Sequence, residues 1–180
     1  MKRALAWLVG ITMVALAAVV GEVTLTDGQQ QAPFAVDAAV GERAEGRTLA
    51  VTVRQVRVTE QVSDGRGWTA SGRWVVVDLD AEARETETGA LLALAQLDLG
   101  DRRISASERP ESIASASLHL GLAQSGSLAF ELPDGATGPA VLRIGRSAED
   151  RLDSVVELAI DLDALEQVAE IDLEETRWAG

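Results

Sequence analysis

Period-two alternation of apolar and polar residues constrains the fold of this chain more than any other feature. In residues 74–83 every odd position is apolar, whereas the even positions carry Asp78, Asp80 and Glu82. The same alternation returns at 118–122, 128–132, 140–144 and 156–162. Further short strands are expected at 34–37 and 49–58 and in a hairpin at 93–107. About eight closely spaced strands separated by turn residues predict an all-β sandwich or barrel.

Residues 49–58 break the alternation once. Leu49, Val51 and Val53 share one face, whereas Val56 and Val58 fall on the other. One extra residue near Gln55, a β-bulge, would return both sets to the core. A strand that crosses between two sheets would also explain the change of phase.

A second local signal lies in residues 93–107. The dipeptide Gly100-Asp101 suits a two-residue hairpin loop, because a type II′ turn prefers Gly at its first position. This register places Asp98 opposite Arg103 and Leu97 opposite Ile104. Opposite charges then pair on one face and apolar residues on the other, as cross-strand pairing favours.

The first residues predict export. The uncharged apolar run Ala4–Val20 has 17 residues and follows Lys2 and Arg3. A bilayer-spanning helix needs about 17–25 apolar residues. A cleaved signal peptide has an apolar core of about 7–15 residues, followed by a cleavage site of small residues. Ala15–Ala17 could supply such a site. The basic residues favour a cytoplasmic N-terminus, so both alternatives place the later residues outside the cytoplasm. We favour an uncleaved anchor.

These signals divide the chain into four parts. We expect a signal-anchor helix at 1–21, a polar linker at 22–33, a β-sandwich at 34–163 and an acidic strand or tail at 164–180. The chain has 180 residues and a net charge of −13. Eleven acidic and two basic residues lie between 148 and 180, so much of the acidity belongs to the C-terminal end. Nucleic acid is not an expected partner, because phosphate binding needs a basic surface.

Four sequence segments resemble a known family. They are "RWVVVDL" at 73–79, "LGLAQSGSLAFELP" at 120–133, "AVLRIG" at 140–145 and "VVELAIDL" at 155–162. In this order they are similar to exported bacterial immunoglobulin-like domains of unknown function, which occur in actinobacterial lipoproteins and include a mycobacterial immunoprotective extracellular antigen. The resemblance implies an antiparallel two-sheet β-sandwich over residues 34–163. It implies no catalytic residues. The chain contains no cysteine, so a tether must come from Ala4–Val20 rather than from a lipid.

The sequence offers few candidates for catalysis. His119 is the only histidine, and a nucleophilic triad usually needs a histidine base. It alternates with Leu118 and Leu120, so it should point away from the core, to solvent or to a sheet edge. The absence of cysteine excludes disulfides, thiolate zinc sites and cysteine nucleophiles.

The carboxylate run could be a metal site or the solvated face of a strand. Asp78, Asp80 and Glu82 should lie about 6.5–7 Å apart along one strand, which is too far for neighbours to share one ion at oxygen–metal distances of about 2.3–2.6 Å. We therefore expect a solvated face, since antiparallel sheets commonly keep one polar face. Asp161 and Asp163 receive the same interpretation.

The tryptophans are expected to differ in exposure. Trp74 should be buried, because Val76 shares its face, whereas Trp68 and Trp178 should be exposed because of their Gly-rich or terminal neighbours. Exposed aromatic residues can anchor an interface.

Together these features predict a non-catalytic binding module rather than an enzyme. We expect a membrane-tethered domain outside the cytoplasm that binds an unknown protein or envelope partner and has no cofactor, metal site or catalytic residue. Two alternatives remain open. One is a small carboxylate-dependent metal-binding or hydrolytic module, and the other is an accessory subunit of a membrane complex.

Overall fold

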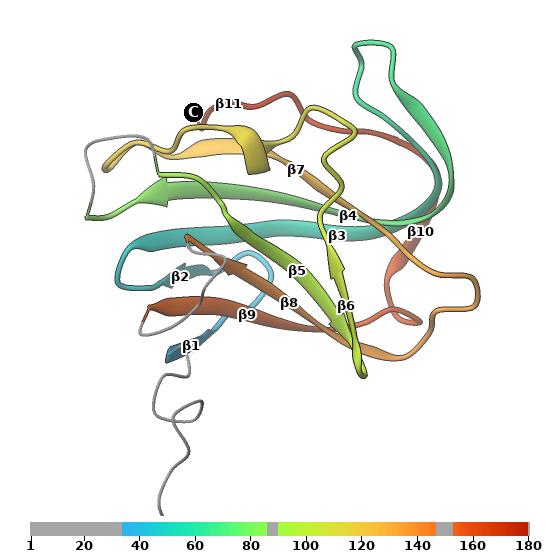
Figure 1. The fold of residues 1–180 in the computed structure, drawn as a ribbon, viewed down its shortest axis with the longest axis horizontal. Coiled ribbons are helices and arrows are strands. Elements are labelled where there is room, and N and C mark those ends of the chain that lie inside the picture. Colours follow the sequence, from blue (N-terminus) through green and yellow to red (C-terminus); the bar gives the residue numbers. More distant parts are fainter. Residues whose placement is uncertain (1–33, 86–89, 147–152, 180) are drawn as a thin grey trace, which may run out of the picture. The chain divides into compact units, whose positions relative to one another are not determined.

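The computed structural model describes residues 34–85, 90–146 and 153–179. The chain divides into two units between Ala32 and Pro33, and every described element belongs to the second. This described part contains eleven strands and the short 3₁₀ helix η1 (Ile113–Ser115), and it has no α-helix. The strands form two sheets that face each other (Figure 1). The prediction of an all-β, two-sheet sandwich is confirmed.

One sheet, called sheet A, has five strands. Its order is β1 (Phe34–Asp37), β9 (Ser154–Asp161), β8 (Pro139–Gly145), β5 (Leu94–Leu99) and β6 (Arg102–Ser105). The other, called sheet B, follows the order β10 (Glu166–Asp172), β3 (Leu49–Ser63), β4 (Thr69–Ala83), β7 (Gln124–Glu131) and β11 (Arg177–Trp178), and β2 (Arg43–Glu45) pairs with β3.

Apolar side chains from the facing sides of the two sheets form the main core. The largest side chains in it include Leu79, Leu97, Phe130 and Leu142, each at most 1% exposed. Burial of one such side chain contributes about 1.5–3 kcal/mol. Because the chain has no cysteine, this packing replaces the disulfide of antibody-type domains.

The predicted β-bulge in β3 is confirmed. The pairing of β3 with β4 shifts register between Val53 and Gln55. As a result Val51 and Val53 before the shift, and Val56 and Val58 after it, all lie in the main core. One inserted residue thus keeps two sets of valines, one on each side of the insertion, on the same face.

The predicted hairpin is also confirmed. Asp98 pairs with Arg103 and Leu97 with Ile104, and Gly100 has a φ of 56°. The Asp98 Oδ1–Arg103 Nε distance is 3.9 Å. A positive φ at the first loop position is what a type II′ turn requires, and Gly adopts it without strain.

The expectation of a wholly antiparallel sandwich is wrong at two sheet edges. Strand β1 pairs in parallel with β9, and β10 pairs in parallel with β3. Only antiparallel neighbours can be joined by a tight hairpin. In both edge pairs more than 90 residues separate the two strands in sequence, so the chain is free to approach its neighbour in the parallel direction.

The strand predicted at 118–122 does not form. Leu118 is buried, but Leu120 and Leu122 are 44% and 56% exposed, and the segment makes only isolated bridges. Gly121 has a φ of 69°, and the Leu122 N–H bonds to the His119 carbonyl, 3.4 Å between N and O. A tight turn therefore replaces the strand, which the alternation of three leucines did not indicate.

The C-terminal residues form a crossing segment. Strand β10 lies at one edge of sheet B and β11 at the other, so residues 173–176 pass over the outer face of this sheet. Leu173 packs there against Trp74, Val76 and Ala129, which form a second, smaller core. The face that the sequence analysis assigned to solvent is therefore covered by the end of the chain.

The predicted anchor is not part of this description. Residues 4–20 lie outside the described residues, and the described part contains no helix long and apolar enough to cross a membrane. The tether therefore stays a prediction from the sequence.

Candidate functional site

The three carboxylates of β4 pair with arginines of neighbouring strands, and Asp78 and Asp80 lie beside the crossing segment. Asp78 is only 5% exposed, pairs with Arg57 of β3, and accepts a hydrogen bond from Ser127 of β7, with an Oγ–Oδ1 distance of 2.6 Å. Glu82 pairs with Arg43 of β2. The prediction of a solvated strand face is wrong for Asp78, because the C-terminal segment and these partners replace water.

Asp80 is half-buried in the same row. Its Oδ1 lies 3.1 Å from Arg54 Nε and accepts a hydrogen bond from Ser125 Oγ at 2.6 Å. Arg54 also pairs with Glu174 of the crossing segment. The hydrogen bond between these two side chains raises the pKa of Arg54 and lowers the pKa of Glu174.

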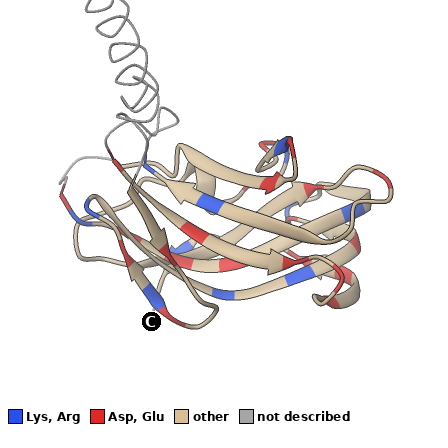
Figure 2. Ribbon diagram, turned by 90° about the horizontal axis from the view of Figure 1, so that it is seen from below, with Lys and Arg blue, Asp and Glu red and all other residues tan. Residues whose placement is uncertain are grey.

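This row of ion pairs ties the strands of sheet B together and fastens the crossing segment. Figure 2 shows acidic and basic positions lying side by side on neighbouring strands. Each carboxylate of the row has a guanidinium partner, so a cation would have to displace an arginine. Among the described residues, no three histidine, aspartate or glutamate side chains are grouped so that they could hold a metal ion.

The other candidates from the sequence have structural contacts. His119 is half-buried, and its ring centroid lies 5.3 Å from that of Trp178. Asp161 Oδ1 accepts the Asp163 N–H at 3.1 Å, and Asp163 Oδ2 accepts the Gly138 N–H at 3.0 Å. These two aspartates build the turn after β9, and the structure brings neither together with His119.

Two tryptophans meet on the outer face of sheet B. Trp74 is fully buried and Trp178 is 56% exposed, as the sequence predicts, but Trp68 is half-buried and the prediction of its exposure is wrong. The Trp68 and Trp74 rings meet edge to face, with centroids 5.9 Å apart. The backbone N–H of Trp68 donates to Asp64 Oδ1 at 3.0 Å within the turn between β3 and β4. The Arg109 guanidinium lies 5.2 Å from the Trp74 ring centroid.

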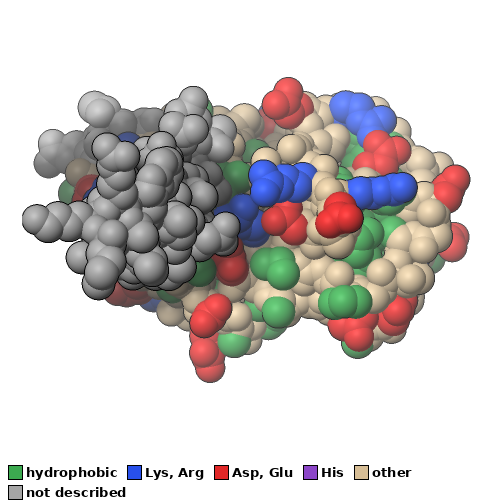
Figure 3. Space-filling view, turned by 60° about the horizontal axis from the view of Figure 1, so that its bottom comes forward, with side chains coloured by type: hydrophobic (Ala, Val, Ile, Leu, Met, Phe, Trp, Pro, Cys, Tyr) green, Lys and Arg blue, Asp and Glu red, His purple; other side chains and the backbone are tan. Residues whose placement is uncertain are grey.

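Charged and apolar side chains are interspersed on one face of the molecule (Figure 3). On the face shown in Figure 3, apolar side chains form small patches separated by acidic and basic ones. A concave site of a different kind lies at the sandwich edge, between β5 and the segment that follows β6.

This groove opens where β6 leaves β5. The last bond between the two runs from the Ala106 N–H to the Ala95 carbonyl, 2.9 Å between N and O, and the next residue, Ser107, donates its N–H to Ala129 of β7 at 2.8 Å. The chain thus crosses from sheet A to sheet B. Residues 91–93 are left with no strand partner on this side among the described residues.

The resulting cavity has a volume of about 460 Å³ and is lined mainly by small side chains. These include Ala93, Ala95, Ala106, Ala114, Ser112 and Ser115. Small side chains leave room beside the backbone, so a guest can approach the backbone of residues 91–93, which lead into β5. We call this cavity the β5 groove.

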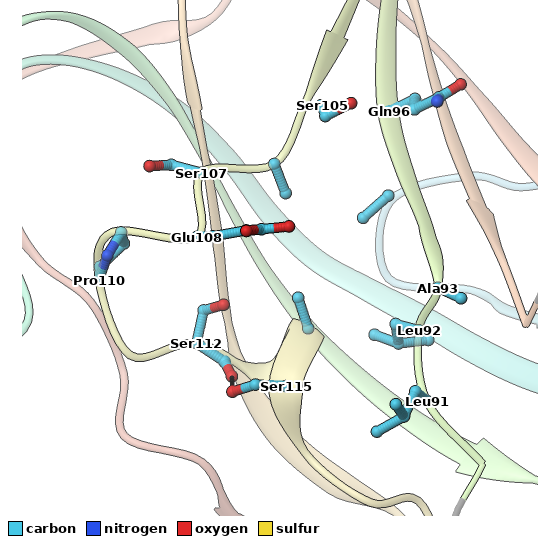
Figure 4. Close-up of a pocket in the computed structure, with 13 residues that line it drawn as sticks. Leu91, Leu92, Ala93, Gln96, Ser105, Ser107, Glu108, Pro110, Ser112 and Ser115 are labelled. Atoms are coloured by element: carbon cyan, nitrogen blue, oxygen red, sulfur yellow. Dashed lines mark hydrogen bonds between the residues drawn. The ribbon is translucent and has the colours of Figure 1, made fainter. Parts of the chain in front are cut away.

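Glu108 is the ionisable residue of the β5 groove. Figure 4 shows its side chain pointing from the segment after β6 into the gap toward β5. No hydrogen bond or ion pair joins it to another described residue, whereas the nearby carboxylate Glu111 pairs with Arg66. At the mouth Leu91 is 45% exposed. The groove therefore offers a backbone edge, an apolar wall and one uncompensated negative charge.

Sequence reasoning missed the β5 groove. Glu108 lies in "ERPESIASAS", a segment predicted only as an irregular connection, and nothing in its composition indicates which strand it will face. The arginine row could have been found, because the bulge at Gln55 places Arg54 and Arg57 on the same outer face. In the hairpin of β3 and β4, Asp78 and Asp80 of β4 lie next to these two arginines of β3.

Two solved structures share this fold. A candidate lipoprotein from Staphylococcus aureus subsp. aureus NCTC 8325 has a TM-score of 0.52 and 8% identity, and the match covers 76% of this chain and 99% of that chain. An uncharacterized β-sandwich protein from Clostridium difficile 630 has a TM-score of 0.50 and 9% identity, covering 72% of this chain and 96% of that chain. No protein-family model and no curated protein matches the sequence.

At such low identities the likeness shows the fold alone. The described chain is thus similar in architecture to an uncharacterized β-sandwich protein and to a candidate lipoprotein. This agrees with the coarser part of the resemblance seen in the sequence. The link to actinobacterial families stays a prediction.

Proposed function

We propose that this chain is a membrane-tethered β-sandwich outside the cytoplasm, of the exported immunoglobulin-like kind, and that it binds a partner without catalysing a reaction. The partner is an extended segment of a protein that carries a basic side chain. The observation that supports this proposal is the β5 groove, in which the backbone of residues 91–93, which lead into β5 without a strand partner, lies beside the unpaired carboxylate of Glu108.

The mode of binding follows from the two walls of the groove. An extended segment laid along residues 91–93 would continue the pairing that β6 begins, and main-chain hydrogen bonds would supply affinity. A lysine or arginine of the guest would pair with Glu108. The charge-assisted bond would fix the register of the guest, since a neutral side chain at that position leaves the carboxylate unpaired.

The tether and the location rest on other observations. The apolar run Ala4–Val20 follows two basic residues, and one structural neighbour is described as a candidate lipoprotein. A lipoprotein is held at a membrane by its lipid. This chain lacks cysteine, so the apolar run would take that part.

Photo-crosslinking in intact cells tests the proposal. A photoreactive residue replaces Ala93, in the β5 groove, and in a matched control replaces Ala159, which is also exposed but lies on β9. We expect a discrete adduct with one protein at position 93 and none at 159. The variant Glu108→Arg should abolish the adduct, whereas Asp134→Arg, on an exposed turn, should leave it. Equal products at both positions, or an adduct insensitive to Glu108→Arg, would overturn the proposal.

A further inference from the structure

Large apolar side chains are exposed mainly at one end of the sandwich. Six are exposed in the described part of the chain, and five of these form what we call the apolar rim. The rim consists of Phe34 (70% exposed), Leu91 (45%), Leu120 (44%), Leu122 (56%) and Trp178 (56%). The sixth, Val40, lies on the loop between β1 and β2.

Strand pairing places the rim residues of sheet B at this end. Ala83, the last residue of β4, pairs with Leu49, the first residue of β3, and forms a bridge with Leu120. Trp178 pairs with Gln124, the first residue of β7, and its ring contacts His119. Each of these contacts lies where a strand of sheet B begins or ends.

The rim residues of sheet A lie at the same end. Phe34 opens β1 and pairs with Ser154, whose Oγ accepts the Arg47 N–H at 2.7 Å just before β3 begins. Leu91 precedes β5, close to the bond from the Leu118 N–H to the Ala90 carbonyl. In Figure 1, β1, the start of β3, the end of β4 and the C-terminus all lie toward the left.

The opposite end has a different composition. It consists of the β3–β4 turn, the β5–β6 hairpin loop and the turns between β7 and β8 and between β9 and β10, and none of the exposed large apolar side chains of the described residues lies there. The apolar rim is therefore a property of one end of the sandwich and is not a general feature of its surface.

The rim is the end where the described chain begins. Thirteen residues separate the apolar run 4–20 from Phe34. A flexible chain of thirteen residues has a root-mean-square span of about 20 Å, whereas the fifteen residues of β3 extend about 50 Å. A tether joined to the end at Phe34 would favour contact of this end, rather than of the opposite one, with a membrane.

We infer that the apolar rim rests on the surface of the lipid bilayer, with Trp178 at the level of the headgroups. The inference depends on the tether in the proposed function. Tryptophan favours the membrane–water interface because its ring is apolar and its N–H is polar. A few side chains bind lipid weakly, but a short tether raises their effective concentration, so a weak contact is populated.

Fluorescence quenching by spin-labelled lipid tests this inference. The chain has four tryptophans, and Trp7 lies within the apolar run, so the full-length variant Trp7→Phe is reconstituted into phosphatidylcholine vesicles with or without doxyl-labelled phosphatidylcholine. We expect the labelled lipid to quench part of the emission. The further change Trp178→Phe should remove the quenching, whereas Trp68→Phe should leave it. Leu122→Glu should reduce it without unfolding the domain, because Leu122 is exposed.

Flotation of the vesicles separates this inference from the tether. Protein that floats with the vesicles while Trp178 stays unquenched overturns the inference and leaves the tether intact. Protein that floats but forms dimers through the apolar rim also overturns the inference and leaves the tether intact. Protein that fails to float contradicts the tether and, with it, the inference.

Discussion

Ser127 and Asp78 form a buried hydrogen bond across β7 and β4, with the Ser127 hydroxyl donating to Asp78 Oδ1 at 2.6 Å. The same hydroxyl oxygen accepts the backbone N–H of Glu174 at 2.9 Å. Ser127 is fully buried. One side chain thus connects the carboxylate row of sheet B to the crossing segment that covers it.

Ser127→Ala should therefore loosen the crossing segment as well as destabilise the domain. The change leaves Asp78 and the Glu174 N–H each without one partner, at a cost of about 2 kcal/mol in the free energy of unfolding. Urea denaturation measures that loss, and hydrogen exchange should show faster exchange of the Glu174 amide. Ser115→Ala is the control, because Ser115 is exposed and bonds only within its own turn. Unchanged exchange at Glu174 would contradict this account.

The ion pair between Asp78 and Arg57 should be worth more than exposed pairs. Asp78→Ala leaves the largely buried Arg57 guanidinium without its carboxylate, which should cost about 3 kcal/mol. Glu111→Ala breaks a pair whose side chains are 51% and 54% exposed, and should cost less than about 1 kcal/mol. Urea denaturation of both variants under the same conditions measures the two losses in the free energy of unfolding. Equal losses would show that burial does not decide the strength of these ion pairs.

The bulge in β3 should be essential for folding. Deleting Gln55 shifts the pairing by one residue, so the valines on one side of the deletion turn from the main core to the outer face. We expect the deletion variant to lose its cooperative unfolding transition. Gln55→Ala removes only the side-chain bond to Glu166, 3.1 Å from Nε2 to Oε2, and should keep the transition. Circular dichroism during thermal denaturation distinguishes the two, and a normal transition in the deletion variant would contradict the argument.

The bulge also shows what the sequence could predict. Local patterns carry information about one strand and its hairpin partner, so the alternation around Gln55 and the Gly100-Asp101 loop both gave correct registers. The same patterns carry no information about a segment that arrives from far along the chain. Asp78 was assigned to solvent because Leu173 and Glu174, nearly a hundred residues later, could not be placed over it. The β5 groove was missed for the same reason, since it forms between segments whose separation only the three-dimensional packing decides.

Acid should remove the contribution of the Glu174–Arg54 pair. The hydrogen bond from Arg54 lowers the pKa of Glu174 in the folded state, so folding favours the ionised carboxylate. This contribution is present above the ordinary glutamate pKa of about 4.3 and is lost as the pH falls through the lower pKa of the folded state.

Glu174→Gln should therefore be less stable than the natural chain near neutral pH, and the difference in the free energy of unfolding should close below about pH 4. In an Arg54→Met background the same change should have little effect at any pH, because the partner is absent. Urea denaturation of the four proteins across this pH range measures the coupling, and a difference that persists in acid would show that Glu174 acts through packing rather than charge.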